Sequence, residues 1–322
     1  MLEQLRHKLF IRNKLIRGAV GEFFGTFLLV FIGDCIVTQY HLGTACSGLD
    51  RNAWININIG WGFAVVFGIF VVSRSSGGHI NPAVTLMLYT FGAVDLKTTA
   101  VYFVAQTIGA FFGAAATYGF YIDAIDDRGL TLPISAFATR CVAAQQITLD
   151  PPDKLKYLQL TAGIFTSFPA QHLSLTGAFV DQAVGTGILC LLIAAIIDKR
   201  NEVPAHMHAL FFGFVVMMIG CSFGLNVGYP INPARDFGPR LFASIIYGTD
   251  VFTVPHSLYF LMPILGPLFG GVAGGWIYYI FSGYQIPDAS DARLTKNARQ
   301  NVNASLEESK PLTSSEDHSH NP

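Results

Sequence analysis

The chain has 322 residues, of which 52% are hydrophobic and 13% are charged, and it contains 32 glycines. This composition is too apolar and too rich in glycine for an ordinary soluble domain, and it predicts a polytopic membrane protein. The formal net charge is −1, which gives no electrostatic basis for binding nucleic acid.

The first half of the chain predicts a basic arm, three membrane spans and one short helix. Residues 1–17 carry five Lys and Arg side chains and should stay on the cytoplasmic side. Each expected span is close to the ~20 residues that a helix needs to cross the hydrocarbon; the spans are 18–40, 55–73 and 98–122. Before the third span, Asn81-Pro82-Ala83 follows turn-forming glycines and precedes a short apolar run. We therefore expect a loop that enters a half-helix at about residues 81–89.

The second half predicts the same arrangement after a long connection. Residues 123–176 contain four prolines and are too polar to form one span, so we expect an outer loop. The next spans are expected at 177–197, 206–223 and 257–281. Asn232-Pro233-Ala234 lies between the last two and predicts a second half-helix at about 232–244. The polar residues 284–322 are expected to form a disordered cytoplasmic tail.

The two Asn-Pro-Ala tripeptides lie 151 positions apart, nearly half the chain. Three spans in each half would place the second half in the membrane with opposite topology, so that the half-helices meet near the midplane. A helix too short to span is tolerated there only when it is buried in protein or lines a watery cavity. The expected fold is an all-α polytopic membrane protein with six transmembrane helices and two re-entrant half-helices in an inverted repeat. The channel domain would cover 18–283, with repeats at 18–122 and 177–283.

The distribution of basic residues predicts the orientation. With both termini inside, cytoplasmic segments hold 13 Lys and Arg residues and the outer loops hold 5, leaving aside those of the second half-helix. This bias favours cytoplasmic termini, and we expect a protein of the plasma membrane. The five cysteines show no metal-ligand spacing, and their odd number excludes complete internal pairing. Cys46 and Cys141 fall in expected outer loops and could pair, a question that stays open.

Three polar side chains are candidates for the pore itself. Asn81 and Asn232 can cap their half-helices through the side-chain oxygen while the NH2 group faces the lumen. Two helix N-termini that meet there would repel cations, and the amide donors would orient water and interrupt a proton-conducting chain. Arg235 places a charge within the membrane, which costs on the order of 2.5–3.5 kcal/mol and usually marks a pathway. We expect it to line the pore rather than form a structural ion pair.

The segments SGGHINPAVT, residues 76–85, and GYPINPARDFGPR, residues 228–240, resemble the major intrinsic protein family, and within it the aquaglyceroporin branch. The resemblance covers about residues 16–283. It implies one pore per subunit in a homotetramer embedded in the lipid bilayer, with no cofactor and no enzymatic activity. The expected permeants are water, glycerol and similar small neutral solutes, with urea left open.

The resemblance also assigns candidate residues. The outer selectivity filter matches Trp61, Gly220, Tyr229 and Arg235. The two aromatic rings would face the carbon backbone of a polyol, Arg235 would bind its hydroxyl groups, and Gly220 would leave room for the carbon chain. Positions typical of the glycerol-passing branch are Tyr121, Asp236, Arg240, Pro267 and Leu268.

Three further residues are expected to support the pore loops. Glu22 resembles a family residue that accepts hydrogen bonds from the loop backbone, and Gln182 is its counterpart in the second repeat. The amide at 182 departs from the commoner carboxylate, but it can still bond the opposite loop. Asp236 could accept backbone N–H groups or pair with Arg240. His79 lies beside the first tripeptide, where we expect a hydrogen-bonded structural role.

Other functions remain as alternatives. A secondary transporter also uses inverted repeats but needs an ionisable coupling site within the membrane, for which Glu22 is the candidate. A junctional scaffold with this fold would show little permeability. An intramembrane enzyme is disfavoured, because no Ser/His or acidic pair has suitable helical spacing. Gly220 and Asp236 favour a glycerol-passing channel over a water-selective one.

Overall fold

A computed structural model describes residues 1–45, 53–127, 129–133, 153–287, 297 and 300–302. All regular secondary structure in these ranges is helical. The chain divides into two compact units, residues 1–279 and 280–322, and the first contains all the sites described below. Cys46 and Cys141 lie outside the described residues.

Six helices of the described chain are long and apolar enough to cross a membrane, which confirms the expected number of spans. Their bounds are α2 Lys14–Ala45, α3 Trp54–Val72, α5 Leu96–Asp127, α8 Leu175–Ile197, α9 His208–Val227 and α12 Met262–Phe281. Helix α2 begins before the predicted residue 18 because the Asn13 side chain accepts hydrogen bonds from Leu15 N and Ile16 N, at 2.9 and 3.2 Å. Helix α12 begins after the predicted residue 257, with Pro263 in its first turn.

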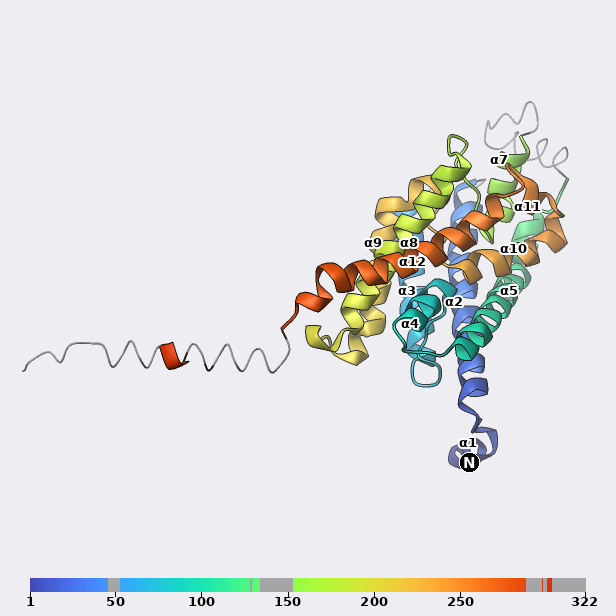
Figure 1. Ribbon diagram of the computed structural model, residues 1–322. Coiled ribbons are helices and arrows are strands. Elements are labelled where there is room, and N and C mark those ends of the chain that lie inside the picture. The colour runs from blue at the N-terminus through green and yellow to red at the C-terminus, as the bar shows by residue number, and fades with distance from the viewer. Residues whose placement is uncertain (46–52, 128, 134–152, 288–296, 298–299, 303–322) are drawn as a thin grey trace, which may run out of the picture. The chain divides into compact units, whose positions relative to one another are not determined.

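The two predicted half-helices are α4 (Pro82–Thr90) and α10 (Pro233–Tyr247), and Figure 1 shows them among the long helices. Each begins with proline directly after an asparagine N-cap. Helix α4 contacts α5 and α8, and α10 contacts α5 and α2. In chain order, α2, α3, α4 and α5 correspond to α8, α9, α10 and α12, so that each half has three long helices and one half-helix. The predicted inverted repeat is confirmed.

Shorter helices fill the connections. They are α1 Leu2–Leu9, α7 Lys154–Leu160, α11 Asp250–Thr253 and the 3-10 turns η1 Ala162–Ile164, η2 Lys199–Asn201, η3 Ala205–Met207, η4 Tyr259–Leu261 and η5 Gly283–Gln285. Helix α1 was not predicted. At the end of η1 the chain is buried in the protein interior, since Ile164 and Phe165 are fully buried. Part of the long connection therefore lies inside the protein, where it can contribute to a site.

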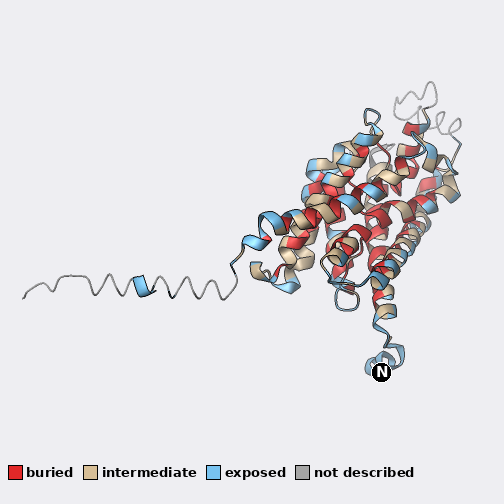
Figure 2. Cartoon of the chain, viewed as in Figure 1, coloured by how far each residue is buried: buried red, intermediate tan, exposed pale blue. Residues whose placement is uncertain are grey.

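Small residues allow the spans to approach closely. A Cβ atom added to Gly109 on α5 would lie 2.2 Å from the Phe23 carbonyl oxygen of α2, and one added to Gly270 on α12 would lie 1.9 Å from Ala183 O of α8. Backbones so close cannot accommodate any larger side chain. Figure 2 shows buried residues concentrated around the half-helices and exposed residues on the outward faces. Many of the exposed ones are large and apolar, as on a surface that faces lipid.

Candidate functional site

The two half-helices meet through exchanged hydrogen bonds. Asn81 Nδ2 donates to Ile231 O at 3.0 Å, and Asn232 Nδ2 donates to Ile80 O at 2.8 Å. Each asparagine Oδ1 caps its own helix, since Asn81 accepts from Ala83 N at 2.9 Å and Asn232 from Ala234 N at 3.1 Å. An amide group carries two N–H donors, so one on each asparagine remains after this exchange. The side-chain oxygens cap as predicted, and the amino groups also join the two loops.

The loops before the half-helices share an unusual backbone conformation. Positive φ occurs at Gly78 (67°) and Ile80 (44°) in the first loop and at the equivalent Tyr229 (49°) and Ile231 (39°) in the second. A left-handed conformation costs about 1–2 kcal/mol for a residue other than glycine. Such strain persists only where surrounding contacts hold the backbone in place.

Two buried side chains supply those contacts. Glu22 on α2 accepts from His79 N at 2.9 Å and from Ile80 N at 2.6 Å. On α8, Gln182 Oε1 accepts from Ile231 N at 3.0 Å. Glu22 and Gln182 thus bind the residue directly before each asparagine, as their predicted supporting role requires.

A cavity of about 160 Å³ passes the meeting point of the half-helices. This inner cavity is lined by both asparagines, and it extends from Trp61 and Arg235 to Ile197, the last residue of α8. Its wall on the long helices is apolar, with Leu29, Val65, Ile69, Leu189, Ile193 and Val216. The two loops before the half-helices also line it, with residues 77–81 and 228–232. The lining therefore combines apolar side chains with loop residues and the two asparagines.

A second, outer cavity of about 270 Å³ adjoins the first. It is lined by Tyr40, Trp54 and Gln159, and it shares Trp61 and Arg235 with the inner cavity. The two cavities adjoin at these shared side chains, a junction called the constriction below.

Arg235 is held at the constriction by uncharged partners. Its guanidinium lies over the Trp61 ring at 4.4 Å, and Nη1 donates to Phe165 O at 3.1 Å. Among the described residues, no carboxylate lies within ion-pair distance of Arg235. The charge faces the cavities, and Phe165 is supplied by the buried part of the long connection.

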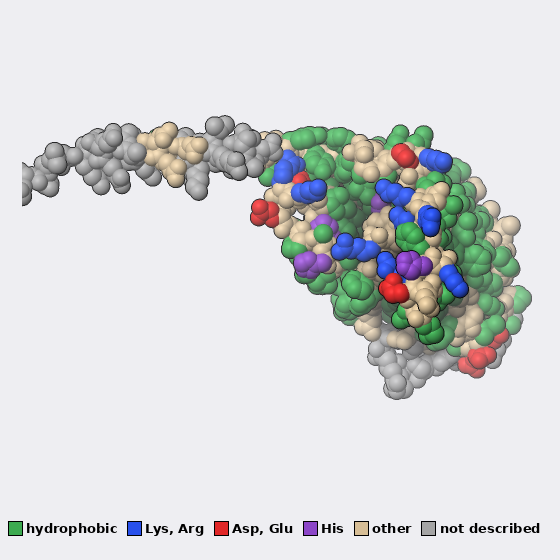
Figure 3. Space-filling view, turned by 90° about the horizontal axis from the view of Figure 1, so that it is seen from below, with side chains coloured by type: hydrophobic (Ala, Val, Ile, Leu, Met, Phe, Trp, Pro, Cys, Tyr) green, Lys and Arg blue, Asp and Glu red, His purple; other side chains and the backbone are tan. Residues whose placement is uncertain are grey.

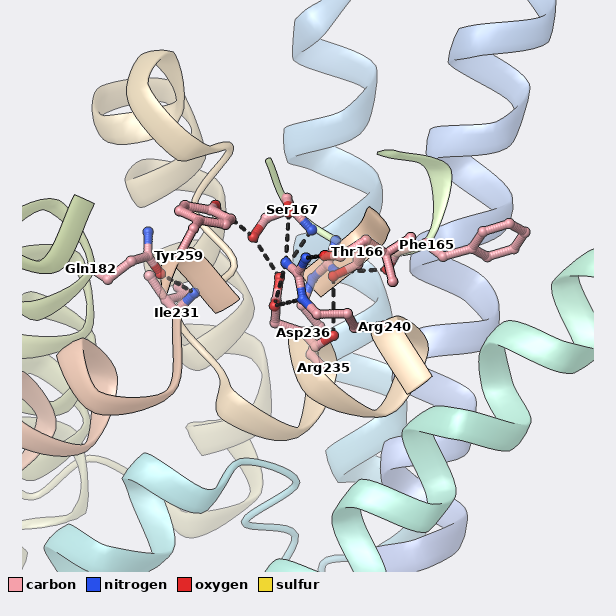
Figure 4. A network of polar contacts seen from close by, with 10 residues as sticks. Phe165, Thr166, Ser167, Gln182, Ile231, Arg235, Asp236, Arg240 and Tyr259 are labelled. Atoms are coloured by element: carbon pink, nitrogen blue, oxygen red, sulfur yellow. Dashed lines mark hydrogen bonds and ion pairs between the residues drawn. The ribbon is translucent and has the colours of Figure 1, made fainter. Parts of the chain in front are cut away.

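A neighbouring ion pair fixes that segment (Figure 4). Asp236 and Arg240 are both fully buried and pair at 2.9 Å. Asp236 Oδ2 also accepts from Ser167 N at 2.9 Å, while Arg240 Nη2 donates to Ser167 O at 2.6 Å. A buried ion pair needs such additional hydrogen bonds to offset desolvation. Both residues therefore position the chain that holds Arg235, and both alternatives predicted for Asp236 contribute.

Gly220 lies behind Tyr229 and does not contribute to the lining of either cavity. A Cβ atom at 220 would lie 2.6 Å from Tyr229 Cζ and 2.5 Å from Asn58 Oδ1. Tyr229 OH donates to that same Asn58 oxygen at 2.7 Å. Instead of leaving space for solute directly, the glycine makes room for the Tyr229 ring.

The remaining candidates lie elsewhere. Tyr121, Pro267 and Leu268 line neither the inner nor the outer cavity. Tyr121 packs in the cluster around Phe165, and Pro267 is buried inside α12. His79 lines the inner cavity, and its Nδ1 lies 3.1 Å from Thr85 Oγ1, which is the hydrogen-bonded arrangement predicted.

Sequence reasoning missed two residues that support the loops and the constriction. Gln106 on α5 donates to Glu22 Oε2 at 2.8 Å and to Thr85 Oγ1 at 3.0 Å. Asn58 on α3 binds Tyr229, as described above. A polar amide within an apolar span is the signal that could have identified both, because such a group needs a buried partner.

One fully buried carboxylate, Asp34, was also missed. Asp34 on α2 is fully buried, and neither of its oxygens has a hydrogen-bond partner within the described ranges. It interacts electrostatically with Arg235 and Asp236, so it lies near the constriction. The prediction that named Glu22 alone as an intramembrane coupling candidate is therefore wrong, since an aspartate inside an apolar span carries the same signal.

Comparisons with known proteins agree with this geometry. The family model described as "Major intrinsic protein" matches residues 10–278. The chain is 35% identical to aquaporin-9 of Rattus norvegicus over 281 residues, or 87% of each chain. It is 34% identical to aquaglyceroporin-3 of Trypanosoma brucei brucei, over 82% of this chain and 78% of the relative. The X-ray structure of the aquaglyceroporin from Plasmodium falciparum matches with a TM-score of 0.67 and 33% identity, over 82% of this chain and 95% of that one. This chain belongs to the major intrinsic protein family.

Proposed function

We propose that the chain is a passive transmembrane channel for water and glycerol that excludes ions and protons. The observation that carries the proposal is the path through two adjoining cavities that meet at Trp61 and Arg235. The names of the relatives, aquaporin and aquaglyceroporin, support the same function.

Ion exclusion follows from the charges along this path. The N-termini of α4 and α10 meet at the inner cavity, so their positive dipole ends repel cations. Arg235 adds a full positive charge at the constriction, without a carboxylate ion-pair partner in the described chain. The remaining N–H donors of Asn81 and Asn232 would bind the oxygen of a passing water and interrupt proton transfer along the water chain.

The mixed apolar and polar lining of the path accounts for passage of glycerol. Trp61 and Tyr229 present aromatic surface to the carbon backbone, and Arg235 offers donors to the hydroxyl groups. The inner cavity is lined by apolar side chains of the long helices and by residues of the two half-helix loops. A polyol with one apolar and one polar edge fits this arrangement. Asp236 and Arg240 act through the segment around Ser167, without contacting solute.

The assembly and orientation belong to the same proposal. Family resemblance supports a homotetramer with one pore per subunit. The excess of Lys and Arg in the segments assigned to the cytoplasm supports a multi-pass protein with both termini inside, and we assign it to the plasma membrane. The chain acts as a channel without enzymatic activity.

Stopped-flow light scattering on reconstituted vesicles tests the function. Vesicles that contain the protein should shrink under an osmotic gradient and re-swell with glycerol much faster than protein-free vesicles, and a urea gradient extends the solute range. A trapped pH dye should record no added proton flux. Flux that follows an ion gradient would instead indicate a transporter, for which Asp34 and Glu22, both fully buried, are the candidate coupling residues. Rates equal to those of protein-free vesicles would indicate a scaffold.

A further inference from the structure

An open apolar groove runs along the outer surface of α2 and α5, away from both cavities. It encloses about 640 Å³ and is lined by apolar side chains alone. Val20 of α2 and Val104 and Ile108 of α5 line it, and they are 50%, 59% and 45% exposed. Residues 104 and 108 follow each other on one helix face. The groove is therefore a continuous surface that opens away from the protein.

The length of the groove corresponds to one leaflet of the membrane. On α2 it extends from Leu15 to Phe23, which at 1.5 Å per residue is about 12 Å. One leaflet contributes half of the hydrocarbon thickness of about 30 Å. The groove begins one residue after the start of α2 and four after the start of α5, so it lies in the leaflet where both helices begin.

Basic side chains gather at the same end. Lys14 is the first residue of α2 and Lys97 the second of α5, and both lie near enough to Asp95 to interact with it electrostatically. Arg17 lies one turn after Lys14 on α2, and its Nη1 donates to Ile11 O at 3.1 Å. Two lysines near Asp95, with Arg17 on the same end of α2, leave this end with excess positive charge. Figure 3 shows Lys and Arg side chains outnumbering acidic ones on this face of the protein.

We propose that this groove binds one anionic phospholipid, with an acyl chain along Val20 and Val104 and the phosphate near Lys14, Arg17 and Lys97. Clusters of Lys and Arg between membrane helices favour acidic headgroups, and each such residue adds binding energy near an anionic surface. An apolar helix face of a second subunit would cover the apolar side chains but would not offset the excess positive charge at this end of the groove. The excess positive charge therefore selects the lipid as occupant.

Native mass spectrometry of the full-length protein tests the charged end. The probes are phosphatidylglycerol and phosphatidylcholine with the same acyl chains. Replacing Lys14 and Lys97 together by Gln should weaken phosphatidylglycerol binding roughly 30-fold and leave phosphatidylcholine binding unchanged. The matched control, Lys8→Gln with Arg12→Gln, removes the same charge from the N-terminal arm and should change either affinity less than about 3-fold. Replacing Lys14 and Lys97 by Arg should restore tight binding, which separates loss of charge from misfolding.

A second pair of variants tests the groove. Val104→Trp fills the groove and should weaken the binding of both lipids. Val71→Trp on α3, where the valine is 53% exposed, should weaken the binding of neither. Water and glycerol flux should stay unchanged in all these variants, so the result does not depend on the proposed channel function. Equal binding of the two lipids to the wild type would refute the proposal. So would an altered subunit number for Val104→Trp with normal lipid binding, which would identify the groove as a subunit contact.

Discussion

Replacing Gly220 by Ala should reduce glycerol passage far more than water passage. The added methyl carbon would lie 2.6 Å from Tyr229 Cζ and 2.8 Å from Tyr229 OH, well inside van der Waals contact. The ring must move by several tenths of an ångström, and the cavity at the constriction is the space open to it. Overpacking costs about 1–3 kcal/mol, and the 2.7 Å bond to Asn58 would be strained or lost, at about 1 kcal/mol more.

The assay is stopped-flow light scattering on vesicles that contain equal amounts of protein. A barrier raised by about 1.4 kcal/mol for glycerol alone lowers its flux about tenfold. The matched control is Gly119→Ala on α5, where an added Cβ meets nothing within 4 Å and both fluxes should stay normal. Gly220→His combined with Tyr229→Cys should also cut glycerol flux and spare water. An unchanged glycerol-to-water ratio in Gly220→Ala, or an equal loss of both fluxes, would refute the inference that the Tyr229 ring controls glycerol passage.

Three other substitutions test separate parts of the site and fold. Arg235→Ala should admit larger polyols and ions in vesicle flux assays, and unchanged selectivity would argue against its place at the constriction. Glu22→Gln should lower the thermal midpoint and both fluxes, because an amide N–H would face a backbone donor at a cost of about 1–3 kcal/mol; an unaltered midpoint would contradict this. Hydrogen bonding from Arg200 lowers the pKa of Asp198 from 3.8 to about 2, and the Asp198 side chain is 6% exposed. Its ionised form therefore stabilises the fold above pH 3.8, by about 2 kcal/mol, and this contribution disappears as the pH falls toward 2. Asp198→Asn should lower the thermal midpoint at pH 7, with the difference from wild type shrinking at pH 3; a constant difference would exclude the ionic cause.

Local patterns predicted the fold well because each expected element depends on nearby residues. Apolar runs of membrane length located the spans, and Asn-Pro at residues 81–82 and 232–233 located both half-helix starts. The duplicated tripeptide then predicted how the halves meet. Glu22 was assigned by family resemblance, and the repeat then identified Gln182 as its counterpart, since equivalent positions perform equivalent roles in both loops.

The missed features depend on contacts between distant segments. Phe165 lies in a connection that was expected to be an outer loop, and no local pattern indicates that its carbonyl binds a side chain 70 positions away. The interaction of Asn58 with Tyr229 spans 171 positions, and it explains why the expected open space beside Gly220 holds a ring instead. Asp34 is a different case, because an aspartate within the apolar span predicted at 18–40 could be seen in the sequence itself.

The exchanged amide bonds between the loops also bear on biosynthesis. Asn81 donates to a carbonyl 150 positions later in the chain. When the first repeat has been translated, the Asn81 amide therefore has no such partner yet. Translation at about 5–20 residues per second delays that partner by roughly 8–30 s. During this interval the Asn81 amide lacks the carbonyl partner that it has in the folded protein. The N-termini of α4 and α10 can therefore reach their final positions only when the second repeat is complete.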